Sequence, residues 1–283
     1  MEWIERWNQA IQYIEEHLTE EIEYEKLGKI AGCSAYHFQR MFNYMAELSL
    51  SEYIRRRKMS LAAADLLSGQ EKIIDIALKY GYASPTAFNR AFQSIHGLAP
   101  SEARRKKKTV RSYPPISFQI MVKGVERMNY RLEEKEAFTV VGFRQLLKKE
   151  LEENFKMVPD MWEQLTHDGS LEKLLPMMDQ KLKGVMGISS CPPKGEWSYG
   201  IAVASGQKPQ EGMEQWEVPA HTWAVFEGAG PCPAAIQELE RQVFTQWLPT
   251  SGYEYDWGPD VEFYTSPDPS QARFQVWVPV KKK

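Results

Sequence analysis

The stretch Ser34-Ala-Tyr-His-Phe-Gln-Arg-Met-Phe42 recurs fifty positions later as Ser84-Pro-Thr-Ala-Phe-Asn-Arg-Ala-Phe92. The same offset joins further identical pairs downstream, which are Leu48/Leu98, Ser51/Ser101, Glu52/Glu102 and Arg55/Arg105. A constant offset over this length indicates a repeated supersecondary unit. Because stacked repeat arrays need at least about three copies for stability, the sequence predicts two similar helical modules instead of a solenoid.

Each copy predicts a helix that begins at a serine and buries one apolar stripe. Ser34 and Ser84 are expected N-caps, since a serine hydroxyl can accept a free backbone N–H of the first turn. Gly97 can end the second copy in the left-handed conformation at low steric cost. Glu47 occupies the equivalent position in the first copy, where the same conformation should cost about 1–2 kcal/mol. The turn that ends the first copy can therefore have a different backbone conformation from the turn at Gly97.

The outward faces of both predicted helices carry polar side chains that can read base edges. Arginine can donate two bonds to guanine, and asparagine or glutamine can pair with adenine in the same way. The predicted base contacts are Tyr36, Gln39 and Arg40 in one copy and Thr86, Asn89 and Arg90 in the other. The predicted phosphate contacts, which position without specifying sequence, are Arg55, Arg56, Arg57, Lys58, Arg104 and Arg105. The alternative is an ordinary hydrated bundle face, but two copies in register favour a pair of helix-turn-helix units.

Residues 1–110 resemble the DNA-binding domain of AraC/XylS-type bacterial transcription regulators. The first copy carries Leu27…Ala31-Gly32-x-Ser34…Phe38-x-Arg40-x-Phe42…Tyr53-Ile54-x-x-Arg57. The second copy carries Ile73…Ile76-Ala77…Gly81-Tyr82…Phe88-x-Arg90-x-Phe92…Gly97…Pro100-Ser101. The resemblance implies an all-α domain with two helix-turn-helix units joined by a long helix. Such a domain is expected to bind double-stranded DNA over about 20 bp, in two adjacent major-groove segments.

The charge distribution fits a polyanion partner but does not decide it, and composition gives no sign of a membrane or metal protein. Residues 1–111 hold 17 Lys/Arg and 14 Asp/Glu, a net charge of +3, against −6 for the remaining residues and −3 overall. The three cysteines and five histidines show no metal-ligand spacing, so we expect no metal, no cofactor and a reducing, cytoplasmic location. No apolar run approaches the roughly 18 residues of a membrane span.

A change of texture near residue 110 predicts a second domain. The basic run at 104–108 and the pair Pro114-Pro115 mark a linker over 111–127, followed by a domain at 128–283. Expected strands cover residues 118–122, 138–141, 183–188, 199–204, 216–227, 261–265 and 273–280, and expected helices cover 154–167 and 233–247. This order predicts an α+β domain with an antiparallel sheet and two main helices. Because strands, helix and strands occur twice, the domain is also a candidate for internal duplication.

Aromatic residues and one carboxylate predict a ligand pocket in this second domain. Seven of the nine tryptophans lie there, and alternation along residues 261–265 places Glu262 and Tyr264 on one face. A carboxylate among aromatic rings suits an organic cation. Burial would also raise the pKa of Glu262, as an enzymatic acid requires, whereas an exposed Glu262 would have neither role. The predicted ligand-binding residues are Trp162, Trp223, Tyr253, Glu262, Tyr264 and Trp277.

Residues 128–280 resemble the GyrI-like effector-binding domain. The segments that carry this are Ala224-Val-Phe-Glu-Gly-Ala-Gly-Pro231, Trp247-Leu-Pro-Thr-Ser-Gly-Tyr253, Glu262-x-Tyr264 and Trp277-x-Pro279. The resemblance implies that Glu262 lies in a pocket for a small organic effector, cationic or aromatic, which alters DNA affinity or RNA polymerase contact. We expect no catalytic residue. Two alternatives stay open: a hydrolase acting on a small electrophile, as in some relatives, and a protein-binding inhibitory module.

Overall fold

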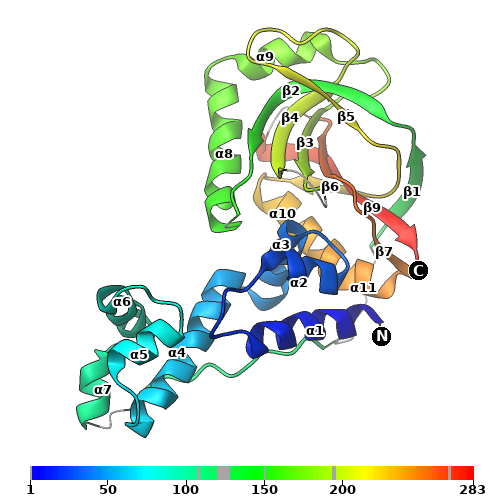
Figure 1. Ribbon diagram of the computed structural model, residues 1–283. Helices are drawn as coiled ribbons and strands as arrows, with labels where there is room; N and C mark the ends of the chain where they lie inside the picture. Colours follow the sequence, from blue (N-terminus) through cyan, green and yellow to red (C-terminus); the bar gives the residue numbers. More distant parts are fainter. Residues whose placement is uncertain (1, 107–108, 120–127, 150, 193–195, 267–268) are drawn as a thin grey trace. The chain divides into compact units, whose positions relative to one another are not determined.

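The computed structural model describes residues 2–106, 109–119, 128–149, 151–192, 196–266 and 269–283 (Figure 1). By its internal contacts the chain divides into two compact units. We call Met1–Ala31 with Ala46–Met121 the helical unit, and Gly32–Met45 with Val122–Lys283 the sheet unit. The helix predicted to read DNA in the first repeat therefore packs with the C-terminal part of the chain. The expected domain limits at 110 and 128 stay a prediction.

The helical unit contains the second copy of the repeat. Its helices are α1 (Glu2–Glu16), α2 (Tyr24–Ala31), α4 (Leu50–Ser68), α5 (Ile73–Lys79), α6 (Pro85–His96) and α7 (Pro100–Lys106). The core around α4 to α7 includes Met59, Leu66, Ile76, Phe88 and Phe92, all fully buried. The expected apolar stripe of α6 is confirmed at its phenylalanines. Ala87 is exposed, however, and His96 near the end of the helix is buried, where its ring Nε2 donates a hydrogen bond to the Met59 carbonyl at 3.1 Å.

Helix ends follow the capping signals of the sequence. Ser84 Oγ accepts a bond from the backbone N–H of Ala87 at 3.1 Å, and Gly97 ends α6 with φ 77°. Ser34 Oγ caps α3 (Ala35–Ala46) in the same way, accepting from His37 N at 3.1 Å. Glu47 adopts φ 54°, so the first copy uses the left-handed turn despite its side chain. That conformation costs about 1–2 kcal/mol relative to an unstrained residue.

Residues 109–119 run back along the helical unit as an extended segment, visible below α4 and α1 in Figure 1. Side chains of the helices accept its backbone N–H groups: Tyr113 N donates to Ser60 Oγ at 2.9 Å and Phe118 N to Asn8 Oδ1 at 2.8 Å. The strand expected over 118–122 is wrong at Phe118, which pairs with a helix instead of a sheet. The remainder of that range, from residue 120, lies outside the described residues.

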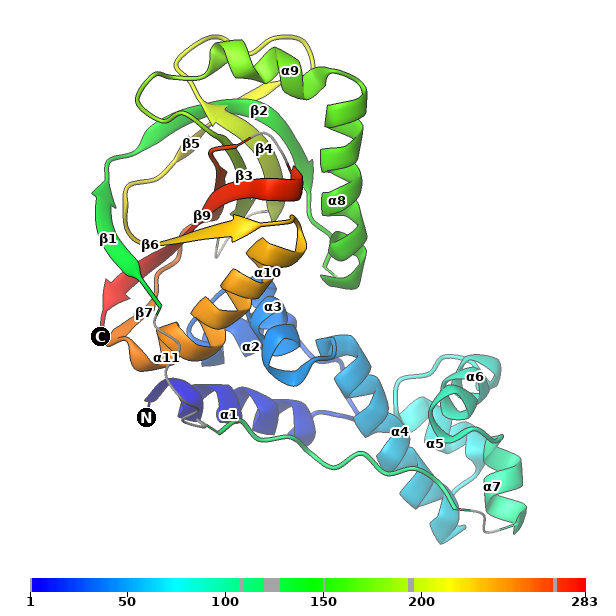
Figure 2. The same ribbon diagram turned by 180° about the vertical axis from the view of Figure 1, so that it is seen from behind.

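The sheet unit is built on one antiparallel sheet (Figures 1 and 2). Its strands are β1 (Tyr130–Lys135), β2 (Phe138–Leu146), β3 (Val185–Ser190), β4 (Ser198–Ala204), β5 (Glu214–Val218), β6 (His221–Gly230), β7 (Tyr253–Tyr255), β8 (Asp260–Tyr264) and β9 (Ala272–Lys282). Its helices, besides α3, are α8 (Leu151–His167), α9 (Ser170–Leu174), α10 (Ala234–Gln242) and α11 (Leu248–Thr250), with a π-helical turn at Val243–Trp247. The range 216–227, expected as one strand, forms two strands, β5 and β6.

The strand order reveals the duplication. The central six strands run β6-β9-β8-β3-β4-β2, so that β8 and β3 meet at the centre and each half reads outward in the same way. One half is strand β2, helix α8 and strands β3 and β4, and the other is β6, α10, β8 and β9. Glu262 of β8 pairs in register with Gly187 of β3 at this central seam. The antiparallel α+β fold is therefore confirmed, with its internal repeat.

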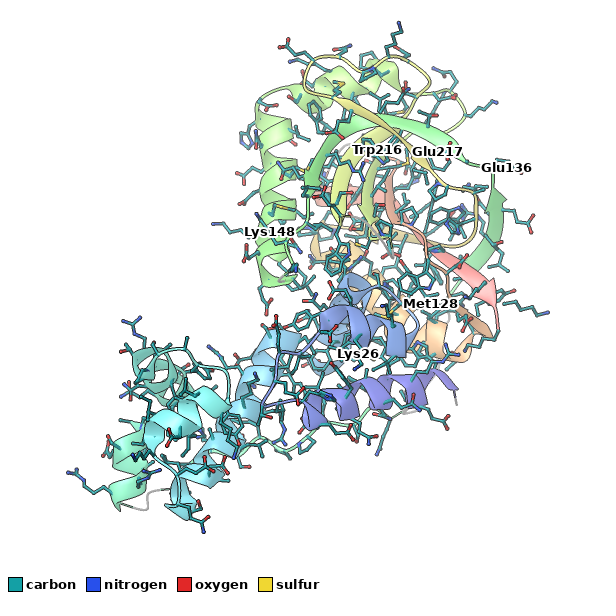
Figure 3. All side chains as sticks on the ribbon, viewed as in Figure 1. Lys26, Met128, Glu136, Lys148, Trp216 and Glu217 are labelled. Carbon is teal, nitrogen blue, oxygen red and sulfur yellow. The ribbon has the colours of Figure 1, made fainter. Side chains whose placement is uncertain are left out.

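The two faces of the sheet bury different cores. On one face α8 packs on β2 and β4 through Met161 and Leu165 against Val141 and Ile201. The other face buries a tryptophan-rich cluster that includes Trp223 and Trp277. On β5, Trp216 packs on that second cluster while its neighbour Glu217 is exposed (both labelled in Figure 3). No helix in the described part of the chain is long and apolar enough to cross a membrane.

Candidate effector cavity and recognition helices

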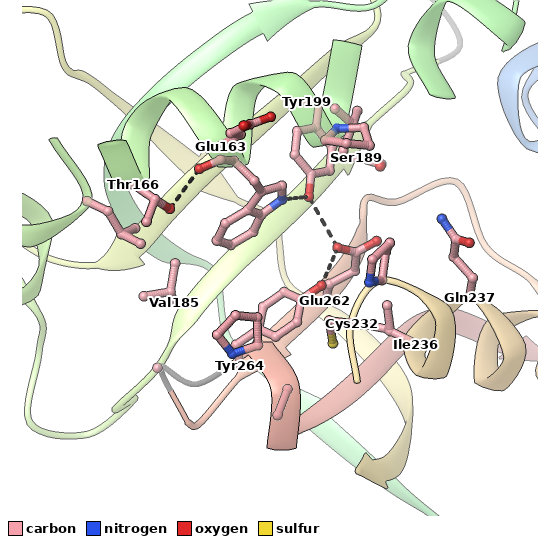
Figure 4. A pocket seen from close by; sticks show the side chains of 18 of the residues that line it. Glu163, Thr166, Val185, Ser189, Tyr199, Cys232, Ile236, Gln237, Glu262 and Tyr264 are labelled. Atoms are coloured by element: carbon pink, nitrogen blue, oxygen red, sulfur yellow. Dashed lines mark hydrogen bonds between the residues drawn. The ribbon is translucent and has the colours of Figure 1, made fainter. Parts of the chain in front are cut away.

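A cavity of about 660 Å³ lies in the sheet unit, between α8 and α10 and over β3, β4 and β8. Most of its lining is apolar or aromatic, and Figure 4 shows part of it from close by. Side chains from α3 also form part of its wall, namely Tyr36, Arg40 and Tyr44. Three carboxylates line it, Glu163 from α8, Glu240 from α10 and Glu262 from β8. The cavity is thus a mainly apolar space that holds acidic groups.

Glu262 is held at the cavity wall by two tyrosines. Its Oε2 accepts hydrogen bonds from Tyr264 OH at 3.0 Å and from Tyr199 OH at 3.2 Å (dashed in Figure 4). Tyr199 OH in turn accepts a bond from Trp162 Nε1 at 2.9 Å. Trp162 also packs edge-to-face on Tyr264, with ring centroids 5.2 Å apart. These three hydrogen bonds and the ring contact fix the carboxylate and place aromatic rings around it.

Gly187 leaves the space in which this carboxylate sits. A Cβ at position 187 would lie 2.3 Å from Tyr199 OH and 2.8 Å from Glu262 Oε2, closer than atoms can approach. Because Gly187 faces Glu262 across the central seam of the duplicated sheet, only one of the two paired positions carries a side chain. An isolated glycine inside a strand often marks such a close approach.

The surroundings raise the pKa of Glu262 to about 7. Burial, which disfavours the charged form, is the main cause, and the nearby Glu240 carboxylate adds to it. Arg40 and the hydrogen bonds from both tyrosines act in the opposite direction. Burial and the adjacent Glu262 also raise the pKa of Tyr199 and of Tyr264, so that both hydroxyls stay protonated as donors. Glu262 therefore changes charge near neutrality.

Three of the six predicted ligand-binding residues line the cavity, and three do not. Glu262, Tyr264 and Trp162 come together there, the first two on one face of β8 as strand alternation predicted. Trp223 and Trp277 are fully buried in the cluster on the opposite face of the sheet. The register explains this, since Trp277 pairs with Val261 and so shares its face. Tyr253, the first residue of β7, stacks on Trp247 and does not line the cavity.

The predicted reading face of α3 is covered. Tyr36, Gln39 and Arg40 are only 6%, 2% and 6% exposed, which contradicts the expectation that they face outward. Arg40 bonds Glu240 at 2.6 Å and Asp260 at 3.2 Å, and Gln39 Nε2 donates to the Lys149 carbonyl at 3.1 Å. The physical reason is that a second domain supplies acidic and apolar partners that a lone helix pattern does not reveal.

The predicted reading face of α6 is open. Thr86 and Arg90 are exposed and Asn89 is half-buried, while Phe88 and Phe92 on the other side are fully buried. The expected division of this helix into an inner and an outer face is therefore present in the structure. Base contact by these residues stays a prediction.

The predicted phosphate contacts divide into surface and structural arginines. Arg55 and Arg56 both pair with Glu52 on the surface of α4, and Arg105 is exposed. Lys58 is half-buried, and its ammonium donates to the Glu20 carbonyl at 3.3 Å.

Two members of that set are engaged inside the helical unit. Arg57 is 7% exposed, donates three hydrogen bonds to the Glu15 carboxylate and also donates to the Tyr113 carbonyl. Arg104 donates to the carbonyls of Leu66 and Glu71 at the end of α4. Both positions hold the fold together, which the charge pattern alone did not distinguish from a phosphate contact.

Sequence reasoning missed Tyr199, Gly187 and Glu240. The lone glycine in the predicted strand was an available signal for a close approach. The tyrosine and Glu240 carried none, because their role depends on strand register and on where α10 lies. Among the described residues no three His, Cys, Asp or Glu side chains gather as a metal site would require.

Comparison with known proteins finds a family model for the N-terminal part of the chain and another for the C-terminal part. A helix-turn-helix domain model matches residues 27–106, and the model of the integron-associated effector binding protein matches residues 131–280. The transcriptional regulator YbfP of Bacillus subtilis is 38% identical over 109 residues, which cover 38% of this chain and 37% of YbfP. The chain thus spans well under half the length of that relative.

Two further proteins are similar to parts of the chain. The regulatory protein SoxS of Salmonella typhimurium is 35% identical over 96 residues, covering 34% of this chain and 90% of SoxS. A solved bacterial transcription regulation protein from Staphylococcus aureus covers 55% of this chain and 99% of its own, at 22% identity and a TM-score of 0.49. Because the effector-binding model matches more than half of the chain and the helix-turn-helix model its first third, the chain belongs to the AraC/XylS-type transcription regulators with a C-terminal GyrI-like domain of the integron-associated effector binding protein family.

Proposed function

We propose that this regulator binds double-stranded DNA through both helix-turn-helix units and takes a small organic cation in the cavity around Glu262. Effector binding would change DNA affinity or contact with RNA polymerase. The observation that carries the effector half is a hydrogen-bonded carboxylate in a mainly apolar cavity of about 660 Å³. This volume falls in the usual range for small-molecule sites, about 300–1,000 Å³.

The chemistry of the lining favours a cation with aromatic or aliphatic bulk. No cationic side chain in the described part of the chain forms an ion pair with Glu262 itself, so its negative charge is available to a ligand. Trp162 and Tyr264 flank the carboxylate, and their ring faces attract cations. An anion is disfavoured beside Glu262, because this carboxylate would repel it in a medium of low dielectric constant.

The open face of α6 supports the DNA half of the proposal. Arg90 is exposed and lies one turn beyond Thr86 on a helix that follows a tight turn, as recognition helices require. Arg40 occupies the same position in α3. Two recognition helices on one chain can bind adjacent segments of one duplex without a second subunit.

The cation proposal is tested by calorimetric titration of the full chain with tetraphenylphosphonium and with tetraphenylborate. The two ions have nearly the same shape and opposite charge. We expect the cation to bind at least tenfold more tightly, and Glu262→Gln to remove most of that preference. Glu217→Gln, an exposed change on β5, is the matched control and should bind as the wild type does. Equal affinity for both ions would reject the proposal.

The pKa of Glu262 near 7 also favours one second candidate, because a general acid–base catalyst needs such a value. A hydrolase would consume a small ester or epoxide in the cavity, whereas an effector site returns its ligand unchanged. Mass spectrometry of the bound molecule after prolonged incubation separates the two, with Glu262→Gln as the control that a hydrolase would not tolerate.

A further inference from the structure

We propose that Glu240 and Asp260 form a latch that occupies the reading face of α3, and that a cation in the cavity competes with Arg40 for this latch. The inference rests on the proposed function and adds the regulation of its site. We define the latch as Arg40 and Tyr44 of α3 with Glu240 of α10 and Asp260 of β8. In this closed state α10 and β8 take the place of DNA on the reading face of α3.

The latch engages the groups that α3 would present to a base pair. Arg40 donates from its two terminal nitrogens to separate carboxylates, Glu240 at 2.6 Å and Asp260 at 3.2 Å. Tyr44 OH donates to the other oxygen of Glu240 at 2.8 Å. A guanidinium held on both terminal nitrogens cannot at the same time form the bidentate bond to guanine. DNA reading by α3 and the closed latch are therefore mutually exclusive.

The charged groups of the latch are buried, and this burial limits how much the latch stabilises the closed state. Arg40, Glu240 and Asp260 are each at most 6% exposed, so their charges are taken out of water. The cost of removing these charges from water offsets much of their attraction, and a buried ion pair therefore adds little net stability. Loss of one partner is nevertheless costly, since it leaves a buried charge unpaired. Such a contact can be opened by a competing charge.

One part of the interface is left incompletely bonded. His37 of α3 stacks on Tyr255 with ring centroids 3.8 Å apart, and its Nδ1 lies 3.7 Å from Asp260 Oδ2. Within the described residues neither ring nitrogen of His37 has a hydrogen-bond partner, and neither does Asp260 Oδ1. Each buried unsatisfied polar atom costs free energy that opening to water would recover. These unbonded polar atoms lower the stability of the closed state relative to a fully hydrogen-bonded interface.

The latch and the effector cavity share Glu240. This carboxylate bonds Arg40 and also faces the cavity that contains Glu262, whose wall includes Tyr36, Arg40 and Tyr44. A cation beside Glu262 is attracted by Glu240 and repelled by the Arg40 guanidinium. Cation binding and a closed latch therefore disfavour each other, and by linkage an open latch must raise cation affinity by the same factor.

Hydrogen exchange of the full-length chain tests the latch directly. The double variant Glu240→Gln/Asp260→Asn should exchange the amides of residues 35–46 at least tenfold faster than the wild type. The same variant should also bind a random-sequence DNA duplex pool about tenfold more tightly. Unchanged slow exchange of the amides in β3 and β8 shows that the sheet is intact. If that sheet is lost, Tyr44→Phe, which removes a single bond to Glu240, replaces the double variant with a smaller expected increase.

Glu238→Gln is the matched control, because Glu238 lies on the same helix and pairs with Arg241 on the surface. It should leave exchange in α3 at the wild-type rate. Unchanged protection of residues 35–46 in the double variant or in Tyr44→Phe would overturn the latch. Faster exchange without tighter DNA binding would also overturn its regulatory role, and would show that α3 does not contact DNA.

Tetraphenylphosphonium tests the competition. Saturating cation should speed exchange of residues 35–46 in the wild type and have no such effect in Glu262→Gln. A cation that binds but leaves α3 protected overturns the competition while the proposed effector site stands. A cation that fails to bind rejects the effector site, and the latch is then decided by the double variant alone.

Discussion

The two copies of the repeat reach different environments from similar sequences. In α6 the reading face is open, with Arg90 exposed, whereas in α3 the matching Arg40 is buried between two carboxylates. Both helices keep the serine cap and the paired phenylalanines. The repeat therefore determines the local helix, and the neighbouring domain determines whether its outer face is accessible. Regulation can act on one copy while the other stays available.

The largest expected difference between the copies is in stability. Arg40→Ala leaves Glu240 and Asp260 buried without a cationic partner, and such a loss costs about 3–5 kcal/mol. Arg90→Ala removes an exposed side chain and should stay within about 0.5 kcal/mol. Denaturant unfolding of the two variants, followed by tryptophan fluorescence of the sheet unit, measures both. Equal stability of the variants would mean that Arg40 is not buried in solution.

DNA binding should show the reverse order. Arg90→Ala should lose about 1–3 kcal/mol and relax the preference at one base pair, as expected for a bidentate contact to guanine. Arg40→Ala should lose less apparent affinity, because it also weakens the latch that hides α3. Binding of a selected duplex and its single-base variants by each protein provides the measurement. A uniform loss on every sequence would reassign Arg90 to a phosphate contact.

The sequence predicted some features of each domain correctly and others wrongly, and the difference has a physical reason. Helix periodicity and caps are local, so α6, Ser84 and Gly97 were predictable. Alternation along β8 is also local and placed Glu262 beside Tyr264 correctly. Which face Trp277 shares depends on its pairing with Val261 across two strands. No local pattern predicts that register, so the prediction that Trp223 and Trp277 line the pocket was wrong.

The exposure of Arg40 failed for a related reason. An arginine on the polar side of an amphipathic helix has the same local pattern whether it meets water, DNA or a buried carboxylate. Its partners Glu240 and Asp260 lie 200 or more positions away along the chain, in α10 and β8. The same applies to Arg57, whose partner Glu15 lies on another helix.

The cavity beside α3 should respond to pH, whereas the face of α6 should not. Glu262 attracts a cation in its ionised form and not in its neutral form, so its pKa of about 7 predicts roughly tenfold weaker tetraphenylphosphonium binding at pH 6 than at pH 8. Tyr199, Tyr264, Glu240 and Arg40 surround the carboxylate, and both tyrosines stay protonated across this range. Titrations at several pH values test this, and Glu262→Gln should show no such slope.

The same shift has a consequence of opposite sign for stability. The folded protein raises the pKa of Glu262 above its usual 4.5, so between about pH 4.5 and 7 it binds more protons than the unfolded chain. Stability from this group is therefore present at low pH and falls as pH rises through that window. At pH 8 Glu262→Gln should unfold at a higher temperature than the wild type. A lower temperature would mean that the carboxylate is not desolvated.

The smallest expected difference lies at the ends of the two repeated helices. Glu47 and Gly97 adopt the same left-handed conformation, with φ 54° and 77°. Glu47→Gly relieves a strain of about 1–2 kcal/mol and adds back about 0.5–1 kcal/mol of chain entropy in the unfolded state. A net stabilisation of about 0.5–1 kcal/mol should follow in thermal unfolding of the full chain. Gly97→Ala, where no atom lies within 4 Å of the added Cβ, should destabilise by a similar amount through strain alone. If neither change altered the stability, Glu47 and Gly97 would not share the left-handed conformation in solution. The similarity of the two copies would then extend only as far as their paired phenylalanines.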